Sequence, residues 1–452
     1  MTMERTSGSP LLRLAAAVLA MLPGLLVPLS APARAETSGP FGLGNLFASP
    51  SQSSEEDEAK AKREELAKQE AALLDELTPT DLFVSLEAAQ RLADAIASYQ
   101  QIVSAGGWPL LPKVPTLRPG DQDESVPLVR RRLQISGDMP AGKSSSWDYD
   151  EAIQAGIKHF QRRHGIPPNG VLDRRTFYAL NVPAMDRLQQ LRINLQRLQD
   201  MARQGLPDRY VMVNVPAQEL QAIDDGRIAL KSRVIVGRIE RPTPTVAAKI
   251  VGLNFFPYWR VPESVAYKDL IPKLGKDPEY LTREHIRVLT DWNGQEIDPH
   301  AVDWSQPQFL NLRFRQDPGE FNALGLVRVD MPNPDNVYMH DTPMKDLFRR
   351  SARAYSAGCV RVQRILDLVA WLAGTNGDWD RARVDSVLTS GLGQDVKLAK
   401  AINVYFIYQT AWVDTELGVA FRNDIYGRDG VEDTARGDRE EREQLPVQSL
   451  AP

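Results

Sequence analysis

The sequence contains a single cysteine, Cys359, among 452 residues. One cysteine excludes an internal disulfide, so this residue is either a small buried apolar side chain or a working thiol.

The sequence also lacks an excess of positive charge, since its formal net charge is −5. This balance argues against a nucleic-acid-binding protein, and we expect no nucleic-acid partner. The run Arg130-Arg131-Arg132 is short and is typical of a solvated helix face.

The chain also lacks an apolar run of the roughly 20 residues that a membrane-spanning helix needs. Its N-terminal apolar stretch, Leu14–Leu29, is shorter than that and is interrupted by two prolines. Positive charge at Arg5 and Arg13, followed by this stretch and by Ala33-Arg34-Ala35, is the layout of a secretory signal peptide. We therefore expect export, with cleavage after Ala35.

Composition and hydrophobic period divide the chain into consecutive segments. We expect a signal peptide at 1–35, a flexible linker at 36–54, a helical scaffold at 55–116, a small three-helix domain at 117–181, a connecting helix at 184–205, a β-rich domain at 209–427 interrupted by a cap insertion at about 263–325, and a disordered tail at 428–452. Strand-like runs without alternating helices predict an α+β multidomain protein with a mostly antiparallel, sandwich-like sheet. Because the insertion lies between strands of the β-rich domain, we expect it to move as a lid.

The small domain at 117–181 has apolar residues at helical spacing, for example from Ile153 to Phe160. Asp148 and Asp173 are the expected N-caps, and Gly165 is the expected helix stop. A loose motif resembles the peptidoglycan-binding domain found on many cell-wall enzymes, with a generic three-helix bundle as the alternative. The motif residues are Phe160, Gln161, Gly165, Asn169, Gly170, Val171, Asp173, Thr176 and Leu180.

A cysteine attacks as the thiolate, and because an ordinary thiol has a pKa of about 8.5 it needs a base. Two of the five histidines, His159 and His164, lie in the small domain with a spacing that does not suit a zinc pair. Two more lie in the insertion. The fifth, His340, follows a β-like segment and precedes Cys359 by a loop short enough to bring the two side chains together.

The neighbours of Cys359 suit acyl transfer. Gly358 allows close backbone approach, and the N–H groups of Gly358 and Cys359 are candidate oxyanion-hole donors. Arg361 offers a fork for a substrate carboxylate, and Ser356 can hydrogen-bond within the loop. Each residue also has a structural interpretation: a turn glycine, a surface ion pair or a cap. Their concentration around the only cysteine favours a site.

His340-Asp-Thr-Pro343 followed by Ser356-Ala-Gly-Cys-Val-Arg361 resembles the signature of the L,D-transpeptidase family, which has a YkuD-type catalytic domain. Large Gram-negative members also carry a peptidoglycan-binding domain and a cap insertion. Ala357 is a departure, since many members have histidine there. Further segments that resemble the family are Val213–Pro216, Arg241–Pro244, Phe256–Pro262, Asn322–Gly325, Met331–Asn333, Trp412–Asp414 and Tyr426–Asp429.

The resemblance implies that Cys359 is the nucleophile, that His340 is the general acid and base, and that the backbone carbonyl of Asp341 orients the imidazole. It implies a tetrapeptide stem of peptidoglycan as donor, a diamino-acid side chain as acceptor, and a 3→3 cross-link as product, with loss of terminal D-alanine. Arg361, Tyr338 and Ser356 are the expected substrate contacts. No metal or other cofactor is implied.

The same resemblance implies a periplasmic location, inhibition by carbapenems, and other cell-wall enzymes as candidate partners. Three alternatives stay open at this point. With water as acceptor the site would be an L,D-carboxypeptidase, and with a protein as acceptor it would attach that protein to the wall. The chain could also be a non-catalytic wall-binding protein with a buried Cys359.

Overall fold

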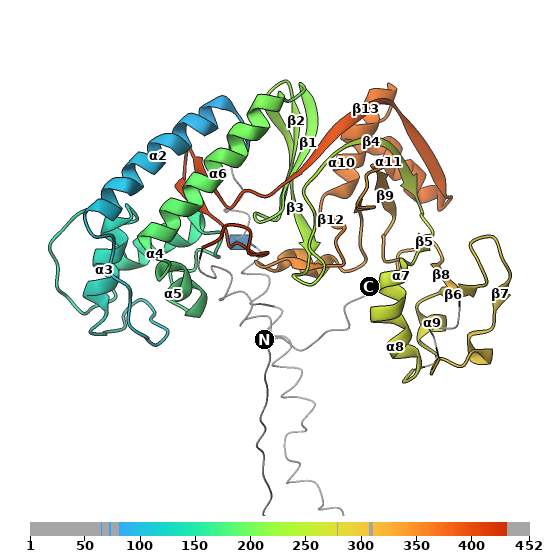
Figure 1. The fold of residues 1–452 in the computed structure, drawn as a ribbon, viewed down its shortest axis with the longest axis horizontal. Coiled ribbons are helices and arrows are strands. Elements are labelled where there is room, and N and C mark those ends of the chain that lie inside the picture. Colours follow the sequence, from blue (N-terminus) through green and yellow to red (C-terminus); the bar gives the residue numbers. More distant parts are fainter. Residues whose placement is uncertain (1–64, 66–71, 74–80, 278, 307–310, 432–452) are drawn as a thin grey trace, which may run out of the picture. The chain divides into compact units, whose positions relative to one another are not determined.

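The computed structural model describes residues 65, 72–73, 81–277, 279–306 and 311–431 (Figure 1). The expected signal peptide, the linker, nearly all of residues 55–80 and the tail from 432 onward lie outside the described residues. Within the described residues, every helix is too short or too polar to cross a membrane.

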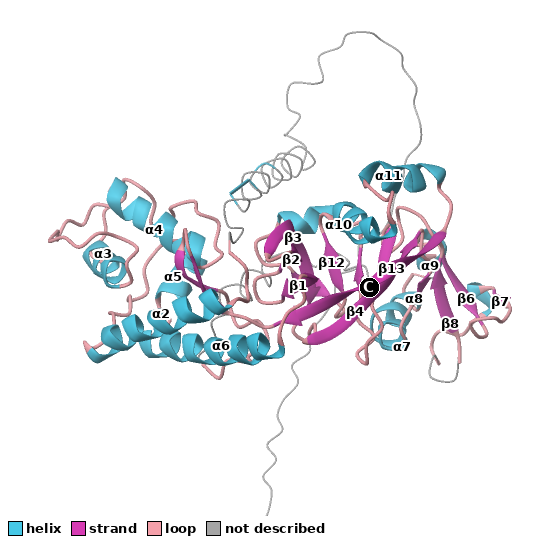
Figure 2. Ribbon diagram, turned by 90° about the horizontal axis from the view of Figure 1, so that it is seen from above, coloured by secondary structure: helices cyan, strands magenta, loops and turns pink. Residues whose placement is uncertain are grey.

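Two long helices form the scaffold next to the small domain. Helix α2 (Leu86–Ser104) begins at Ser85, whose hydroxyl accepts the Ala88 N–H at 3.0 Å. Helix α6 (Ala184–Gln204) lies beside it in both views (Figures 1 and 2). Their facing apolar residues, such as Leu92 and Leu188, pack in one buried cluster.

The small domain has the three expected helices, α3 (Val126–Ile135), α4 (Glu151–Arg163) and α5 (Arg174–Leu180). Its motif surrounds the buried side chain of Gln161, which donates to Asn169, Val171 and Thr176 and accepts from the Gly170 N–H. These polar motif positions therefore hold a turn against α4.

The caps of this domain differ in part from the expectation. Asp173 caps α5, accepting the Thr176 N–H at 2.8 Å, and Gly165 has φ +67°. Helix α4, however, is capped by Asp150 and not by Asp148, since Asp150 accepts the Ile153 N–H at 2.9 Å. Asp148 instead pairs in a short β-bridge with Gln122.

The β-rich domain contains nine paired strands among the described residues, in the order β11-β3-β12-β10-β9-β4-β13-β1-β2. Their bounds are β1 Arg209–Asn214, β2 Glu219–Asp224, β3 Arg227–Gly237, β4 Val246–Phe255, β9 Val327–Asp330, β10 Met339–His340, β11 Ala354–Ser356, β12 Val360–Val362 and β13 Gln394–Ile407. Most pairs are antiparallel, as expected, and together with the helical N-terminal region this confirms the α+β class. The expected sandwich takes the form of one sheet closed on itself, because β2 pairs with β3 as well as with β1.

Strand β2 was not expected from the sequence. The turn at Asp225-Gly226 joins it to β3. The first residue of β2, Glu219, is a buried carboxylate, which is unusual for a strand that lies against a core.

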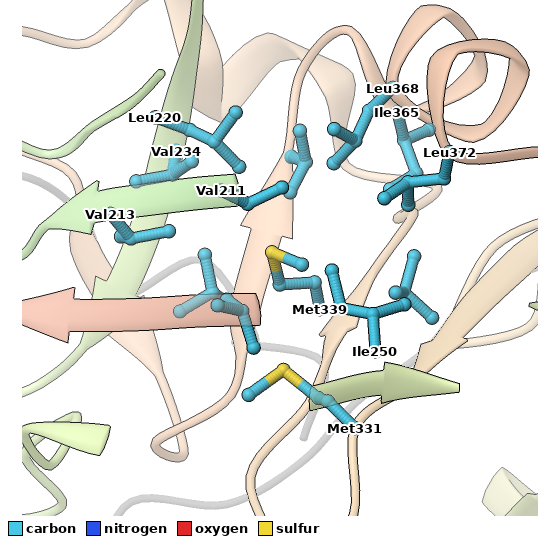
Figure 3. Packing of buried hydrophobic residues seen from close by; sticks show 14 of the residues in the cluster. Val211, Val213, Leu220, Val234, Ile250, Met331, Met339, Ile365, Leu368 and Leu372 are labelled. Carbon is cyan, nitrogen blue, oxygen red and sulfur yellow. The ribbon is translucent and has the colours of Figure 1, made fainter. Parts of the chain in front are cut away.

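Apolar side chains of these strands pack against helices α10 (Ile365–Ala373) and α11 (Arg381–Ser390). Figure 3 shows Leu368 and Leu372 of α10 near Val211 of β1 and Met339 of β10. Met339 directly precedes His340, and its burial fixes the strand that carries this histidine.

The cap insertion has a hydrophobic core of its own. It contains short helices α7 (Glu263–Val265), α8 (Ile271–Leu274) and α9 (Tyr280–Arg283), and a π-helical turn at Ala266–Leu270. A second small sheet joins β5 Trp259–Arg260, β8 Arg313–Gln316, β6 Ile286–Leu289 and β7 Glu296–Ile297. Because β5 precedes residue 263 and pairs in this sheet, the cap begins earlier than the expected start at about 263.

The start of the expected disordered tail at 428 is also corrected. Asp429 is buried, and its carboxylate accepts from Arg197 of α6 at 2.7 Å and from Thr410 at 2.6 Å. Residues 428–431 are therefore part of the folded structure, joined to the helical scaffold.

Candidate active site

The predicted site residues converge at the ends of two neighbouring strands. His340 ends β10, and Cys359 directly precedes β12. The strands pair in parallel, with His340 opposite Arg361, and the Val360 N–H donates to the Tyr338 carbonyl at 3.0 Å. Parallel pairing therefore brings the two motifs to one place, as the loop length predicted. All four of these side chains, those of Tyr338, His340, Cys359 and Arg361, line a pocket of about 280 Å³.

The imidazole of His340 is oriented through the backbone of the next residue. Its Nδ1 lies 2.5 Å from the main-chain oxygen of Asp341. Because a carbonyl oxygen only accepts, Nδ1 carries the proton and Nε2 is the basic nitrogen. The Asp341 carboxylate does not take part: it accepts the Leu326 N–H at 3.0 Å and pairs with Lys345.

Burial holds both reacting groups in their neutral forms. Burial, with Arg361 nearby, lowers the pKa of His340 to about 3. Burial raises the pKa of the Cys359 thiol, although Tyr338 and Arg361 oppose the rise. The resting pair is therefore a thiol and a neutral imidazole, so forming a thiolate here would require a proton transfer from sulfur to Nε2.

Hydrogen bonds between Ser356, Gly358 and Cys359 hold the loop that ends at Cys359. Gly358 has φ +122°, a conformation that favours glycine, and its N–H donates to the Ser356 hydroxyl at 3.1 Å. This corrects one prediction, because the Gly358 N–H already has an acceptor and is not directed to an oxyanion. The Cys359 N–H is the remaining candidate donor. Ser356 in turn donates to the Cys359 carbonyl at 2.5 Å, so its hydroxyl organises the loop.

Thr243 braces this loop from the Arg241–Pro244 segment. Its hydroxyl donates to the Gly358 carbonyl at 2.8 Å and accepts the Gly237 N–H at 2.8 Å. The Tyr426 hydroxyl accepts the Thr243 N–H at 3.1 Å and donates to the Gly237 carbonyl at 2.6 Å. Both segments resemble the family, but the sequence alone indicated no role for Thr243 or Tyr426.

Arg361 and Tyr338 lie next to the reacting atoms. Arg361 is only 4% exposed, its Nε has no hydrogen-bond partner among the described residues, and its Nη1 meets the Met344 sulfur at 3.8 Å. A buried cation with unused donors suits a substrate carboxylate. Tyr338 and Trp259 line the same pocket as Cys359, and Tyr338 opposes the rise in the pKa of the thiol. This influence of Tyr338 on the thiol was not indicated by the sequence.

The rest of the pocket wall was not predicted from the sequence. The cap contributes Trp259, Ser264 and Val265, and the loop before β10 contributes Asp335. Ala357, which stands where many family members have histidine, also lines the pocket and packs partly against the cap core. No sequence signal pointed to Asp335, because an exposed acid in a Pro- and Asn-rich turn resembles any surface loop.

Comparison with known proteins agrees with the resemblance found in the sequence. Residues 208–392, which include both motifs, match the family described as "L,D-transpeptidase catalytic domain". The chain carries a catalytic domain of the L,D-transpeptidase family. Residues 122–180 match the family described as "Putative peptidoglycan binding domain". The small domain and the L,D-transpeptidase domain therefore both agree with the resemblance found in the sequence.

A Haemophilus influenzae protein described as "Putative L,D-transpeptidase" is 37% identical over 244 residues. The match covers 53% of this chain and 48% of that protein, so the chain spans about half the length of the curated relative it matches.

Among solved structures, an L,D-transpeptidase from Stackebrandtia nassauensis is 14% identical, with 64% of this chain and 94% of that chain covered and a TM-score of 0.24. An L,D-transpeptidase from Mycobacterium smegmatis is 13% identical, with 44% and 58% covered and a TM-score of 0.22.

Proposed function

We propose that the chain is an L,D-transpeptidase that uses Cys359 to join peptidoglycan stem peptides through 3→3 cross-links. One observation supports this most: His340 ends β10, Cys359 directly precedes the neighbouring parallel strand β12, and both share a pocket with the buried cation Arg361. The L,D-transpeptidase catalytic domain supplies the reaction class, and the peptidoglycan-binding domain supplies the substrate class.

In this mechanism the Cys359 sulfur attacks the carbonyl of the third stem residue while His340 Nε2 takes the thiol proton. The C–N bond to terminal D-alanine breaks, and the imidazolium protonates the leaving amine. A side-chain amine of a second stem then attacks the thioester, its proton passes to Nε2, and the thiol is regenerated. Each cycle exchanges one amide for another, so the overall reaction needs no external energy source.

The surrounding groups have distinct tasks in this proposal. The Cys359 N–H is the candidate oxyanion donor, since the Gly358 N–H is bound to Ser356. Arg361 binds a substrate carboxylate, and Tyr338 donates to the sulfur as negative charge develops on it. Ser356 acts indirectly, by holding the loop that presents Cys359.

The test incubates the protein with purified tetrapeptide muropeptides and measures products by mass spectrometry. We expect 3→3 dimers and free D-alanine from the unmodified chain, and none from Cys359→Ser or His340→Ala. His159→Ala, in the small domain, is the matched control and should react normally. Dimers made by Cys359→Ser would refute the nucleophile assignment, and tripeptide monomers alone would show an L,D-carboxypeptidase instead.

Inhibition offers an independent test of the nucleophile. We propose that carbapenems acylate Cys359, which intact-protein mass spectrometry would detect as one added inhibitor mass. The adduct should be absent from Cys359→Ser. An adduct that persists in that variant would contradict the proposal.

We also propose export to the periplasm with cleavage after Ala35, on the strength of the N-terminal charge and apolar pattern. N-terminal sequencing of the protein from a periplasmic fraction should then begin at Glu36. Recovery of an intact N-terminus from the cytoplasmic fraction alone would contradict it.

A further inference from the structure

The pocket that holds Cys359 and His340 contains a charged residue to which the proposed mechanism gives no task. Asp335 lines this pocket together with the two reacting residues, and its side chain is exposed. Arg361, the cation of the same pocket, is only 4% exposed. The two charges therefore lie at different depths, with the cation at the base of the pocket and the carboxylate at its rim.

The turn that carries Asp335 is held in place by hydrogen bonds. The side-chain amide of Asn333 donates to the carbonyls of Met331 at 2.6 Å and Val337 at 2.7 Å. The Asn336 N–H donates to the Asn333 carbonyl at 3.2 Å. Asn336 has φ +52°, a left-handed conformation that asparagine adopts more readily than most residues. These bonds fix the backbone on both sides of Asp335, so the turn presents the carboxylate at a defined place on the rim.

The same turn is joined to the strand pair that carries the nucleophile. Tyr338 follows Asp335 by three residues, which limits the distance between their Cα atoms to about 11 Å. The Tyr338 carbonyl accepts the N–H of Val360, the residue directly after Cys359, at 3.0 Å. Asp335 is therefore within reach of a long side chain on a residue bound at Cys359.

Much of the remaining pocket wall is apolar and comes from the cap. Trp259 and Val265 line the pocket and are each 4% exposed, and Leu324 is 3% exposed. Apolar surface of this kind covers the methylene groups of a long side chain, whereas a carboxylate binds an ammonium group at its end. The pocket thus combines the two features that recognise an aliphatic amine.

We propose that Asp335 binds the side-chain ammonium of the third stem residue in the donor, and so selects a diamino acid at that position. This inference rests on the proposed function, in which Cys359 attacks the carbonyl of that residue. A 3→3 cross-link joins two third residues, so the donor residue carries the same kind of side-chain amine that the acceptor uses. Because its carbonyl is bound at Cys359, its side chain has to lie in this pocket.

The donor ammonium suits Asp335 better than the acceptor amine does. The acceptor has to attack as the neutral amine, and an adjacent carboxylate stabilises the charged form. The side-chain amine of the donor takes no part in the reaction, so it keeps its charge throughout. An ion pair with Asp335 therefore positions the attacked carbonyl and does not weaken the attacking group.

Calorimetric titration of the full chain carrying Cys359→Ser tests the proposal, because this variant cannot form the thioester that consumes the donor. The probes are a tetrapeptide with a free side-chain amine at its third residue and the same tetrapeptide with that amine acetylated. We expect the free amine to bind about fivefold more tightly, which is the effect of one exposed ion pair. High salt should shrink this preference, because exposed charges are screened.

Two further variants in the same background locate the effect. Asp335→Asn should remove the preference and leave the affinity for the acetylated peptide unchanged, which would show that the pocket is intact. Asp378→Asn, at an exposed position in the loop before α11, is the matched control and should keep the preference. A preference of the same size in Asp335→Asn would overturn the proposal.

Release of D-alanine and formation of cross-links are measured in parallel on chains that retain Cys359. If the unmodified chain released no D-alanine although the binding preference was present, the proposed function would fail and the ammonium site would stand. If Asp335→Asn kept normal donor binding and D-alanine release but formed fewer cross-links, the ammonium would belong to the acceptor, and the proposal would be wrong.

Discussion

At the scale of single residues, burial decides how Cys359 and His340 work. The pKa of His340 is lowered to about 3 and that of the thiol is raised, so neither is charged at neutral pH. A stable thiolate–imidazolium pair, the common way to activate a cysteine, is thereby disfavoured. In the proposed reaction, the thiol becomes reactive only when a substrate fills the pocket and Nε2 takes its proton.

This protonation state predicts a distinctive pH profile. Alkylation of Cys359 by iodoacetamide should accelerate with a midpoint above the ordinary thiol pKa of about 8.5, because burial disfavours the thiolate. Acylation by substrate should not lose a general base as the pH falls through 6.5, since the imidazole is protonated only near pH 3. Rates are measured by mass spectrometry of the intact protein. A plateau of fast alkylation between pH 6 and 8 would instead reveal a stable ion pair.

At the scale of elements, the Cys359 loop depends on one hydroxyl from a distant segment. Thr243→Val removes the donor to the Gly358 carbonyl and leaves the buried Gly237 N–H without its acceptor. We expect a loss of about 1–3 kcal/mol in the free energy of unfolding, together with slower acylation by carbapenem. Urea unfolding and stopped-flow acylation measure the two effects. Thr389→Val, at an exposed helical position, is the control. Similar losses of unfolding free energy and acylation rate in both variants would show that the Thr243 hydroxyl does not stabilise the Cys359 loop.

The cap is joined to the catalytic domain by an ion-pair cluster close to the same loop. Asp269 of the cap accepts from Arg238 at 3.0 Å and also pairs with Arg241. If the cap moves as a lid, Asp269→Asn should speed hydrogen exchange of cap amides roughly fivefold or more, because partly buried charge-assisted bonds are worth about 1–2 kcal/mol. Asp277→Asn breaks an exposed pair within the cap and serves as the control. Equal hydrogen-exchange rates of the cap amides in both variants would indicate that the cap is a fixed wall of the pocket and does not move as a lid.

How much the sequence could predict also depends on the element. Strands β1, β3 and β4 have long apolar runs that the sequence makes recognisable, and a β-like segment was expected before His340, where β10 lies. Strand β12 has only three residues and was not predicted. Strand β2 was not predicted, because it begins with Glu219 and its buried polar residues give it the composition of a loop. The role of Ser356 could not be decided either, since a serine hydroxyl serves a substrate or a loop equally well until its partners are known.

At the scale of the whole molecule, the chain after β13 connects the catalytic sheet to the helical scaffold. Its residues reach back to α6, where Gln190 and Asn194 are fully buried. Asn194 donates to the Thr410 hydroxyl at 2.7 Å and accepts the Thr410 N–H at 2.9 Å. Because these partners are more than 200 positions apart in the sequence, no local pattern could have revealed the contact.

Asp429 is the central acceptor of this connection, so its removal should weaken the fold as a whole. Its fully buried carboxylate accepts from Thr410 at 2.6 Å, Arg197 at 2.7 Å and Gln190 at 3.3 Å. Asp429→Ala leaves these donors unpaired, and we expect a loss of about 2–4 kcal/mol. For a chain of this size that corresponds to a melting temperature lower by about 5–10 °C. Asp346→Ala, whose carboxylate is exposed, is the matched control. If calorimetry gave both variants the same melting temperature, the buried network would not be what joins the scaffold to the catalytic domain.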